Sequence, residues 1–453
     1  MQPMREVVIK DTLGGAPVAL EPREPPKVGI YACGPTVYSR IHVGNARPFV
    51  VFTLLRRFLA HQGYEPKLVI NVTDVNDKIY DAARVAGVDS ADYAAEMTRL
   101  YFADTEALGV GRPDAEPLAT ETVPEIVALI EALIDGGHAY ESQGDVYFRV
   151  RSFDGYGKLS NRDPEEMDQG EEAGSAELKE SALDFALWKA RKEGEDTAWQ
   201  SPWGEGRPGW HIECSAMAEK LLGADFEIHG GGSDLVFPHH ENEIAQTEAA
   251  RGLPLARIWM HNGMIRTAET KMSKSLGNIF QLSEAVERFG AAAVVAYLSS
   301  GHYRQPLDFS EQALRESQAR LSRIVNYLHE PAVAGTADDF VSERREIFLA
   351  SLADDFNTPR AWAAVFEIVA EGNRRPLAGA HDALAELLEL LGLESLLAAG
   401  TDASSEAEAL NAERDQARAA GDYVRSDELR DRLAALGWEV RDTAAGGQLR
   451  SRD

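Results

Sequence analysis

Residues 27 to 72 constrain the fold more than any other stretch, because they predict two buried strands joined by one helix. Lys27 to Cys33 and Lys67 to Val72 are apolar runs typical of buried strands. Between them, apolar residues from Phe49 to Leu59 recur at helical spacing, and Gly63 follows as a helix-ending residue. A strand, helix and strand of this length predict a parallel βαβ unit, and such sheets bind ligands at the carboxyl ends of their strands. We therefore expect an α/β fold with a ligand site just after the first strand.

The tetrad His42-Val43-Gly44-Asn45 lies at or just before the start of this helix. Free backbone N–H groups and the helix dipole favour phosphate at such a position. Gly44 leaves room for a base or ribose to lie on the backbone, while His42 and Asn45 can donate hydrogen bonds to phosphate oxygens. The tetrad alone predicts a phosphate site only weakly.

A second segment, Lys271-Met272-Ser273-Lys274-Ser275, holds two lysines three residues apart among small polar residues. It is typical of a loop that grasps phosphate, and an ordinary exposed basic loop is the alternative. In this order in one chain, the two segments resemble the signature motifs of class I aminoacyl-tRNA synthetases. That class usually has His where this chain has Asn45, so the resemblance implies the same reaction with an altered rate.

Two thiols, an imidazole and a carboxylate form a candidate metal site. Cys33 ends the first strand, Cys214 lies in a predicted helix, and His239 and Glu243 share one helical face at i and i+4. This set suits tetrahedral zinc. The spacing leaves alternatives open: His240 is as close to Glu243 at i and i+3, the acidic and histidine residues could cap a helix, and the cysteines could be free core residues.

Three longer segments narrow the resemblance to the cysteinyl-tRNA synthetase family: Tyr31 to Tyr38, Gly209 to Ala216 and Ile228 to Glu243. In that family the residues matching Cys33, Cys214, His239 and Glu243 bind one zinc per chain, which also takes the substrate thiol. The resemblance implies catalytic roles for His42, Asn45, Lys271 and Lys274, and ATP contacts from these four residues together with Gly44 and Gly230. It implies substrate contacts from Thr36, Thr73, Trp210, His229 and Asp234.

Zinc makes chemical sense of cysteine selection. Serine is nearly isosteric with cysteine, so a steric pocket rejects it poorly. Zinc stabilises a thiolate, whereas a hydroxyl is a harder and far less acidic ligand. The expected partners are therefore L-cysteine, ATP with Mg²⁺, and cysteine tRNA. The expected reaction forms cysteinyl-adenylate and then passes the acyl group to the tRNA, without a separate editing domain.

The chain divides into three expected parts. Residues 1–310 predict a class I Rossmann-like catalytic domain, with a connective insertion around 115–205 and the lysine loop near its end. Residues 311–399 predict a tRNA-binding helical bundle, in which Leu314, Leu321, Val325 and Leu328 line one helical stripe. Residues 406–453 predict a small C-terminal anticodon-binding domain.

Two sequence segments support the tRNA interpretation by resemblance. Asp354 to Pro359 and Asp422 to Asp431 resemble the tRNA-binding end of the synthetase family. A related ligase that joins cysteine to an amino sugar lacks this end, and it is one alternative. A non-catalytic paralogue that only binds tRNA is the other alternative.

The charge of the chain disagrees with an RNA partner. Its 46 Lys and Arg against 74 Asp and Glu give a net charge of −28, the opposite of what nucleic-acid binding favours. The segment from Glu406 to Asp453 is the least repulsive toward RNA, with 8 Arg against 11 acids.

No apolar run approaches the roughly 18 residues of a membrane span, and the N-terminus has no apolar signal region. We expect a cytoplasmic monomer.

Overall fold

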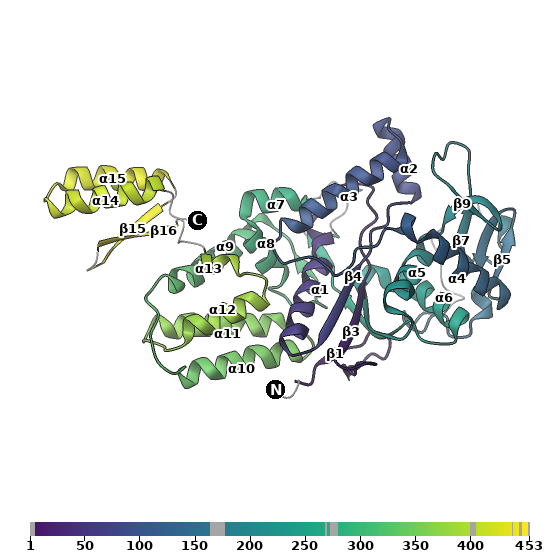
Figure 1. Cartoon of the computed structure of the whole chain (residues 1–453), viewed down its shortest axis with the longest axis horizontal. Coiled ribbons are helices and arrows are strands. Elements are labelled where there is room, and N and C mark those ends of the chain that lie inside the picture. Colours follow the sequence, from purple (N-terminus) through teal and green to yellow (C-terminus); the bar gives the residue numbers. More distant parts are fainter. Residues whose placement is uncertain are drawn as a thin grey trace. The chain divides into compact units, whose positions relative to one another are not determined.

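The computed structural model describes residues 5–163, 177–267, 270–271, 280–398, 405–436, 438–443 and 446–451. The chain forms two compact units, whose elements are labelled in Figure 1. The first unit comprises Met1–Arg288, Leu298–Phe309 and Ala350–Pro359, and the second comprises Phe289–Tyr297, Ser310–Leu349 and Arg360–Asp453.

A four-stranded parallel sheet forms the centre of the first unit. Its strands are β3 (Lys27–Ala32), β4 (Glu65–Ile70), β10 (Phe226–Gly232) and β11 (Ala256–Asn262). They lie in the order β11-β10-β3-β4, and each neighbouring pair is parallel. The chain runs from β3 to β4 on one side and later returns to β10 on the other, so the order reverses between β3 and β10. Ligands of open α/β sheets bind at such a reversal.

Helix α1 (Val43–His61) joins β3 to β4 and completes the predicted βαβ unit. It is buried on nearly all sides from Phe49 to Leu55. Helix α5 (Trp210–Leu222) precedes β10, helix α6 (Glu241–Arg251) lies between β10 and β11, and the two helices pack against each other. Helix α6 is unusual because the residues it buries are mostly polar, and this burial requires internal partners. The predicted α/β class with a parallel Rossmann-like sheet is confirmed.

A separate antiparallel sheet is inserted between β4 and β10. Its order is β5-β6-β7-β9-β8. The strands are β5 (Ala139–Ser142), β6 (Asp145–Phe148), β7 (Phe185–Ala190), β8 (Trp199–Ser201) and β9 (Gly204–Pro208). Three helices precede the sheet: α2 (Asp77–Ala86), α3 (Ser90–Glu106) and α4 (Val123–Asp135). Phe148, Phe185 and Trp188 are fully buried in the core that this sheet shares with α4.

Short elements complete the described part of the first unit. The pair β1 (Val8–Lys10) and β2 (Pro17–Ala19) is antiparallel. A second small sheet has the order β13-β12-β14, from β12 (Ile265–Thr267), β13 (Thr270–Lys271) and β14 (Leu307–Asp308). Helix α7 (Leu282–Phe289) and single turns at Ala119–Thr122, Val150–Ser152, Ser233–Leu235 and Val236–His240 are the remaining elements.

Helices supply most of the second unit. They are α8 (Ala291–Leu298), α9 (Glu311–Leu328), α10 (Asp339–Ala353), α11 (Thr358–Gly372), α12 (Ala380–Leu390) and α13 (Ser395–Ala398). The buried stripe of α9 differs from the expected one: Ile324 and Tyr327 join Leu314 and Leu321, whereas Val325 and Leu328 are only half-buried. Tyr327 lies on the buried stripe at helical spacing, but the sequence pattern was read from aliphatic residues only and did not include it.

The end of the second unit is a small α/β element. Helices α14 (Ser405–Ala419) and α15 (Tyr423–Ala435) lie side by side and pack on the antiparallel hairpin of β15 (Trp438–Thr443) and β16 (Gly446–Ser451) (Figure 1). A small cluster centred on Leu410, Leu429 and Leu433 forms its core.

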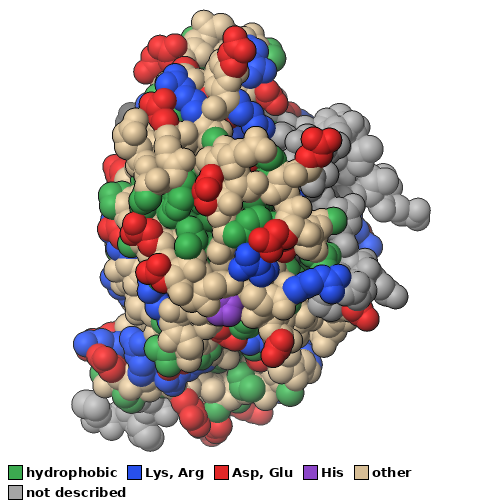
Figure 2. Space-filling view, turned by 90° about the vertical axis from the view of Figure 1, so that its right-hand side faces the viewer, with side chains coloured by type: hydrophobic (Ala, Val, Ile, Leu, Met, Phe, Trp, Pro, Cys, Tyr) green, Lys and Arg blue, Asp and Glu red, His purple; other side chains and the backbone are tan. Residues whose placement is uncertain are grey.

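The surface of the protein mixes charges of both signs. Seen from one side, acidic and basic side chains are interspersed with apolar ones (Figure 2). Among the helices that the structure describes, none has the length and apolar character needed to cross a membrane.

Candidate active site and metal centre

A cavity of about 360 Å³ opens at the carboxyl ends of β3 and β10. Of the predicted site residues, it is lined by Cys33, Thr36, His42, Gly44, Asn45, Trp210 and Asp234. Lys78 of α2, Tyr101 of α3 and the segment Asn262–Ile265 complete much of its wall. Residues from both sides of the strand-order reversal therefore meet around one cavity, as the βαβ pattern predicts.

His42 and Asn45 form a reciprocal cap at the start of α1. The His42 ring nitrogen Nδ1 accepts from the Asn45 backbone N–H at 3.3 Å, and Asn45 Oδ1 accepts from the His42 backbone N–H at 3.1 Å. This capping box satisfies two otherwise unbonded donors. Because Nδ1 is the acceptor, the proton of a neutral His42 ring lies on Nε2. Asn45, the residue that departs from the class signature, thus has a structural role that the sequence interpretation missed.

The described residues that follow the second signature segment contact the first one. Phe280 accepts a hydrogen bond from the Val43 backbone N–H at 3.1 Å, and Leu282 donates to the Ile41 carbonyl at 3.1 Å. His42 forms an isolated antiparallel bridge with Gln281. Lys271 lies in β13, where its backbone pairs with Arg266. The Lys271 side chain and the whole of Lys274 lie outside the described residues.

Arg47 is a site residue that the sequence interpretation missed. It lies on α1 and is fully buried, and its guanidinium donates to the carbonyls of Gly263, His302 and Gln305. Gly263 lines the cavity. Arg47 therefore ties the start of α1 to a segment that forms the opposite cavity wall. No spacing rule in the sequence could have found it, because its partners are carbonyls more than two hundred residues away.

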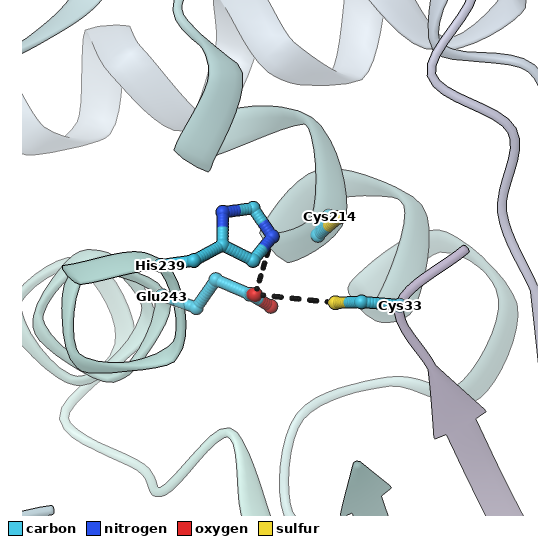
Figure 3. Close-up of side chains that lie close together, drawn as sticks. All are labelled: Cys33, Cys214, His239 and Glu243. Atoms are coloured by element: carbon cyan, nitrogen blue, oxygen red, sulfur yellow. Dashed lines mark hydrogen bonds and ion pairs between the residues drawn. The ribbon is translucent and has the colours of Figure 1, made fainter. Parts of the chain in front are cut away.

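The four predicted metal ligands converge from different parts of the first unit. Cys33 follows β3, Cys214 lies on α5, His239 lies in the turn Val236–His240, and Glu243 lies in the first turn of α6 (Figure 3). Their ligand atoms all lie within 4.8 Å of one another, and all four residues are buried. Glu243 Oε1 is 3.5 Å from Cys33 Sγ and 3.1 Å from His239 Nε2.

The electrostatics of this cluster suit a cation. Burial, together with the neighbouring Cys214, raises the pKa of the Cys33 thiol, and burial raises that of Cys214. Burial also lowers the pKa of His239 to about 3, so the imidazole is neutral and can coordinate. Two thiols, a neutral imidazole and a carboxylate within reach of one point form a donor set for zinc. The described residues therefore fit the metal that the resemblance implies.

A second donor combination overlaps the first. It consists of Cys33, His229, His240 and Glu243. The two Glu243 oxygens separate the possibilities: Oε2 lies 2.8 Å from His229 Nε2, while Oε1 faces His239 and Cys33. His240 Nε2 is 3.9 Å from Oε1, and His240 Nδ1 bonds to His261 Nε2 at 2.8 Å. Cys33 and His239 therefore share one oxygen of Glu243 at short distance, which favours the first set. His229 contacts the other oxygen of the same carboxylate.

His211 is a further residue that the sequence interpretation missed. Its Nδ1 lies 2.9 Å from Nδ1 of His239, and both rings are buried. Burial lowers the pKa of His211 to about 3, so this ring too is neutral. Trp210, which is 37% exposed, stacks on the His239 ring with centroids 4.4 Å apart. At the start of α5, His211 therefore contacts a ring nitrogen of the predicted ligand His239, and Trp210 covers a face of the same ring.

Two further predicted contacts lie beneath the cavity lining. Thr73 is 1% exposed, and its hydroxyl donates to Glu213 Oε2 at 3.1 Å. Gly230 is buried in β10, where an added Cβ would overlap the Phe52 ring and the Met260 carbonyl. The close packing of β10 against α1 therefore leaves no room for a side chain at position 230. Burial raises the pKa of the Glu213 carboxyl, which accepts the hydrogen bond from Thr73.

Comparison with known proteins bears on the whole chain. A family model described as "tRNA synthetases class I (C) catalytic domain" matches residues 19–319. Models of a DALR domain and of a "Cysteinyl-tRNA ligase anticodon binding domain" match residues 347–395 and 401–450. Proteins named cysteine–tRNA ligase are 46% identical in Brevibacillus brevis, covering 93% of this chain and 95% of the relative, and 46% identical in Halorhodospira halophila, covering 98% and 99%.

The chain belongs to the cysteine–tRNA ligase family.

Solved structures of more distant class I enzymes agree with the fold. A leucyl-tRNA synthetase from Agrobacterium radiobacter K84 has a TM-score of 0.60 at 13% identity, covering 84% of each chain. A methionyl-tRNA synthetase from Mycobacterium tuberculosis has a TM-score of 0.58 at 16% identity, covering 94% of this chain and 99% of the other. At this identity the likeness concerns the fold alone. Membership of the cysteine–tRNA ligase family rests on the sequence relatives.

Proposed function

We propose that this chain ligates L-cysteine to cysteine tRNA through a cysteinyl-adenylate intermediate. One observation supports the proposal: Cys33, which belongs to a buried cluster of donors suited to zinc, lines the same cavity as the tetrad that is predicted to bind phosphate. Cys33 and His42 both line this cavity. A thiol-selecting site and an ATP site within one cavity are what the activation of cysteine requires. The family relatives support the same activity.

The cofactor that we propose is one Zn²⁺ per chain, held by Cys33, Cys214, His239 and Glu243. When bound, zinc supplies a site that favours a thiolate over a hydroxyl and so distinguishes cysteine from serine. The remaining residues of the floor orient this set. His229 contacts the second oxygen of Glu243, and His211 and Trp210 hold the His239 ring.

In the first step, a carboxylate oxygen of cysteine attacks the α-phosphorus of Mg-ATP, and the bond from this phosphorus to the bridging oxygen of the β-phosphate breaks. A carboxylate is already ionised at neutral pH, so positioning and charge stabilisation suffice without a general base. We propose that His42 Nε2–H and Asn45 donate to phosphate oxygens, with Gly44 beneath the nucleotide. Lys271 and Lys274 neutralise the charge on the leaving pyrophosphate.

Substrate cysteine is proposed to lie between the metal site and this tetrad. Asp234 is exposed and lines the cavity, which suits it to bind the ammonium group, and Trp210 and Thr36 border the same space. Thr73, His229 and Gly230 are buried beneath the lining. We therefore propose that these three support the site indirectly, by orienting Glu213, by orienting Glu243 and by packing on α1.

The second step transfers the acyl group to the terminal ribose of cysteine tRNA. We propose that residues 1–310 are the catalytic domain, with its insertion around 115–205, and that 311–399 and 406–453 bind tRNA, the last at the anticodon. Tyr423, at the start of α15, is 66% exposed, and exposed aromatic rings stack on unpaired bases. We further propose that the protein acts as a monomer in the cytoplasm, where ATP and tRNA occur. Light scattering of the purified chain tests the monomer.

The decisive experiment compares two acceptors and one partial reaction. Charging of cysteine tRNA with labelled cysteine is expected, together with cysteine-dependent pyrophosphate exchange in the absence of tRNA. Ligation to an amino sugar without tRNA charging would overturn the proposed acceptor, and absence of both activities would favour a non-catalytic paralogue. Lys274→Ala should reduce exchange more than about tenfold with the fold intact.

Metal analysis tests the zinc site separately from the tRNA activity. Cys214→Ser is expected to lose most of its zinc, because a hydroxyl is a poor zinc ligand beside Cys33. Ser215→Ala, one residue along α5 and outside the donor set, is the matched control and should keep its zinc. Full zinc content in Cys214→Ser would exclude this residue as a ligand.

A further inference from the structure

Tyr31 is a fully buried residue of β3 that lies directly beneath the predicted metal ligands. It precedes Cys33 by two residues, so the two side chains leave the same face of the chain. Its register partner on β10 is His229, and the partner of His229 on β11 is Trp259. Trp259, His229 and Tyr31 therefore form one row across the sheet, and Cys33 follows this row at the carboxyl end of β3.

This row already supplies one support of the metal set. His229 Nε2 lies 2.8 Å from Glu243 Oε2. The Tyr31 ring lies beside the His229 ring, with the ring centroids 5.2 Å apart, and it belongs to the same buried cluster as Cys33 and Cys214. Cys33 lines the active-site cavity, whereas Tyr31 is not among the residues that do. The phenol is therefore packed among the donors and away from the substrate.

The Tyr31 hydroxyl lies beside sulfur and lacks a better acceptor. Among the described residues, it makes no hydrogen bond of normal geometry. Burial raises the pKa of this hydroxyl, and the neighbouring Cys214, Cys33 and Glu243 raise it further. Burial also raises the pKa of the Cys214 thiol, and Tyr31 is one of the neighbours that act in the opposite direction. A buried hydroxyl without an acceptor costs free energy, and a neighbouring anion can recover it.

The proposed zinc site needs such a donor because of its charge. Two thiolates and one carboxylate carry three negative charges against the two positive charges of Zn²⁺, and the thiolate of substrate cysteine adds a fourth. Buried negative charge requires hydrogen-bond donors. The partners described above, His229 and His211, bond to Glu243 and His239 and not to a sulfur.

We propose that Tyr31 is a positioning residue of the metal site, whose O–H donates to the Cys214 sulfur when zinc holds this sulfur as a thiolate. A thiol is a weak acceptor and an anion is a strong one, so metal binding strengthens the contact. The hydrogen bond draws charge from the sulfur and so favours the approach of a further thiolate, that of cysteine. The inference rests on the proposed zinc site and extends it to a residue that contacts neither metal nor substrate.

Tyr31→Phe separates this role from a packing role, because it removes the hydroxyl and keeps the ring. In the full chain treated with a chelator, loss of an unpartnered buried hydroxyl should leave the urea midpoint unchanged or raise it. Zinc affinity, measured by competition with a chromophoric chelator, should fall about 10- to 100-fold. A lower urea midpoint, or zinc affinity within about twofold of wild type, would overturn the inference.

Cobalt(II) in place of zinc reports on the sulfur atoms directly. Loss of a hydrogen bond raises the energy of the sulfur electrons, so the sulfur-to-cobalt charge-transfer band of Tyr31→Phe should lie at longer wavelength than that of wild type. Titration with cysteine, followed at the same band, should give a dissociation constant at least about threefold higher in the variant. A band at the wild-type position would overturn the inference.

Tyr64→Phe is the matched control. Tyr64 is also buried, but it directly precedes β4 at the amino ends of the strands, whereas Cys33 lies at their carboxyl ends. Its hydroxyl donates to the Arg5 carbonyl at 3.3 Å. Tyr64→Phe should therefore keep the zinc affinity and the cobalt band of wild type, and its urea midpoint should be unchanged or lower. Equal losses of zinc affinity in both variants would overturn the role of Tyr31.

The zinc content of wild type distinguishes this inference from the proposed metal site. A wild-type chain that binds no zinc would overturn both. One zinc per chain, bound with equal affinity by wild type and Tyr31→Phe, would overturn the inference alone and keep the proposed metal site.

Discussion

The contact between His211 and His239 leads to a prediction about metal affinity. If His239 binds zinc through Nε2, which faces Glu243, its proton must lie on Nδ1. That proton then points to His211 Nδ1 at 2.9 Å, and His211 accepts it as a neutral ring. His211 would therefore fix both the tautomer and the orientation of the ligand. Partners of this kind commonly stabilise metal binding although they do not touch the metal.

His211→Phe removes the acceptor and keeps a ring of similar shape. The His239 N–H is then buried without a partner, which costs about 1–3 kcal/mol. Zinc affinity should fall by a comparable amount, about 10- to 100-fold, in line with the effect of losing such a partner in other zinc proteins. His211→Asn is the matched control, because its side-chain oxygen can occupy the place of Nδ1 and should recover most of the affinity.

The assay is competition for zinc between the full chain and a chromophoric chelator, so the readout does not depend on catalysis. Pyrophosphate exchange adds a second readout: KM for cysteine should rise in His211→Phe, while KM for ATP changes little. Zinc affinity of His211→Phe within about twofold of wild type would refute the reasoning, since an unpaired buried N–H predicts a loss of at least about tenfold. Equal losses in the Phe and Asn variants would refute the role of the acceptor.

Three further predictions follow from the described contacts. Arg47→Met leaves three buried carbonyls without their donor, so it should lower the free energy of unfolding by about 3 kcal/mol or more in urea titrations and raise KM for ATP; an unchanged midpoint would contradict this. The buried histidines with a pKa near 3 take up protons only on unfolding, so the metal-free chain should lose about 1.4 kcal/mol per histidine for each pH unit below about 6.5. The raised pKa of Glu213 acts in the opposite direction for one proton, so the net expectation is a lower urea midpoint at pH 5.5 than at pH 7.5, and an equal or higher one would contradict it. Arg414→Met removes a fully buried guanidinium and its ion pairs with the partly exposed Asp415 and Asp442, so it should destabilise the C-terminal element and reduce tRNA charging at least about tenfold, with pyrophosphate exchange kept as the control; equal loss of both activities would contradict a role confined to tRNA.

The sequence predicted the parts of the site that depend on local order. Cys33 ends a strand and His42 precedes a helix, and both facts can be read from apolar spacing within a few residues. The topology of a βαβ unit then brings these positions to the same edge of the sheet. Residue type and spacing also proposed Cys214, His239 and Glu243 with alternatives left open, and the resemblance to the synthetase family favoured this set. Their convergence is visible only in the folded structure.

Other features of the site could be identified only from the folded structure. His211 and His239 meet across 28 residues of chain, and no spacing rule encodes a contact between two helix starts. The ATP contact of Gly230 stays a prediction, and the structure adds that Phe52 of α1 and the Met260 carbonyl leave no room for a Cβ there. The reciprocal cap of His42 and Asn45 is different, because polar residues at N-cap and N3 are a recognisable pattern. The sequence pattern of these two residues therefore fits a helix cap as well as a phosphate site.

The connection from β3 to α1 explains how selection and activation can be both close together and separable. Cys33 belongs to the metal set and His42 to the helix cap, and both line one cavity. The other members of the metal set come from α5, from the turn before α6 and from α6, whereas the cap is supported by residues 280–282 and, through Arg47, by the wall at Gly263. The metal set and the helix cap therefore have different supporting residues. We expect changes beneath the metal set to alter only KM for cysteine, and changes around the start of α1 to alter only KM for ATP. A single variant on either side that altered both constants equally would mean that the connection itself had moved.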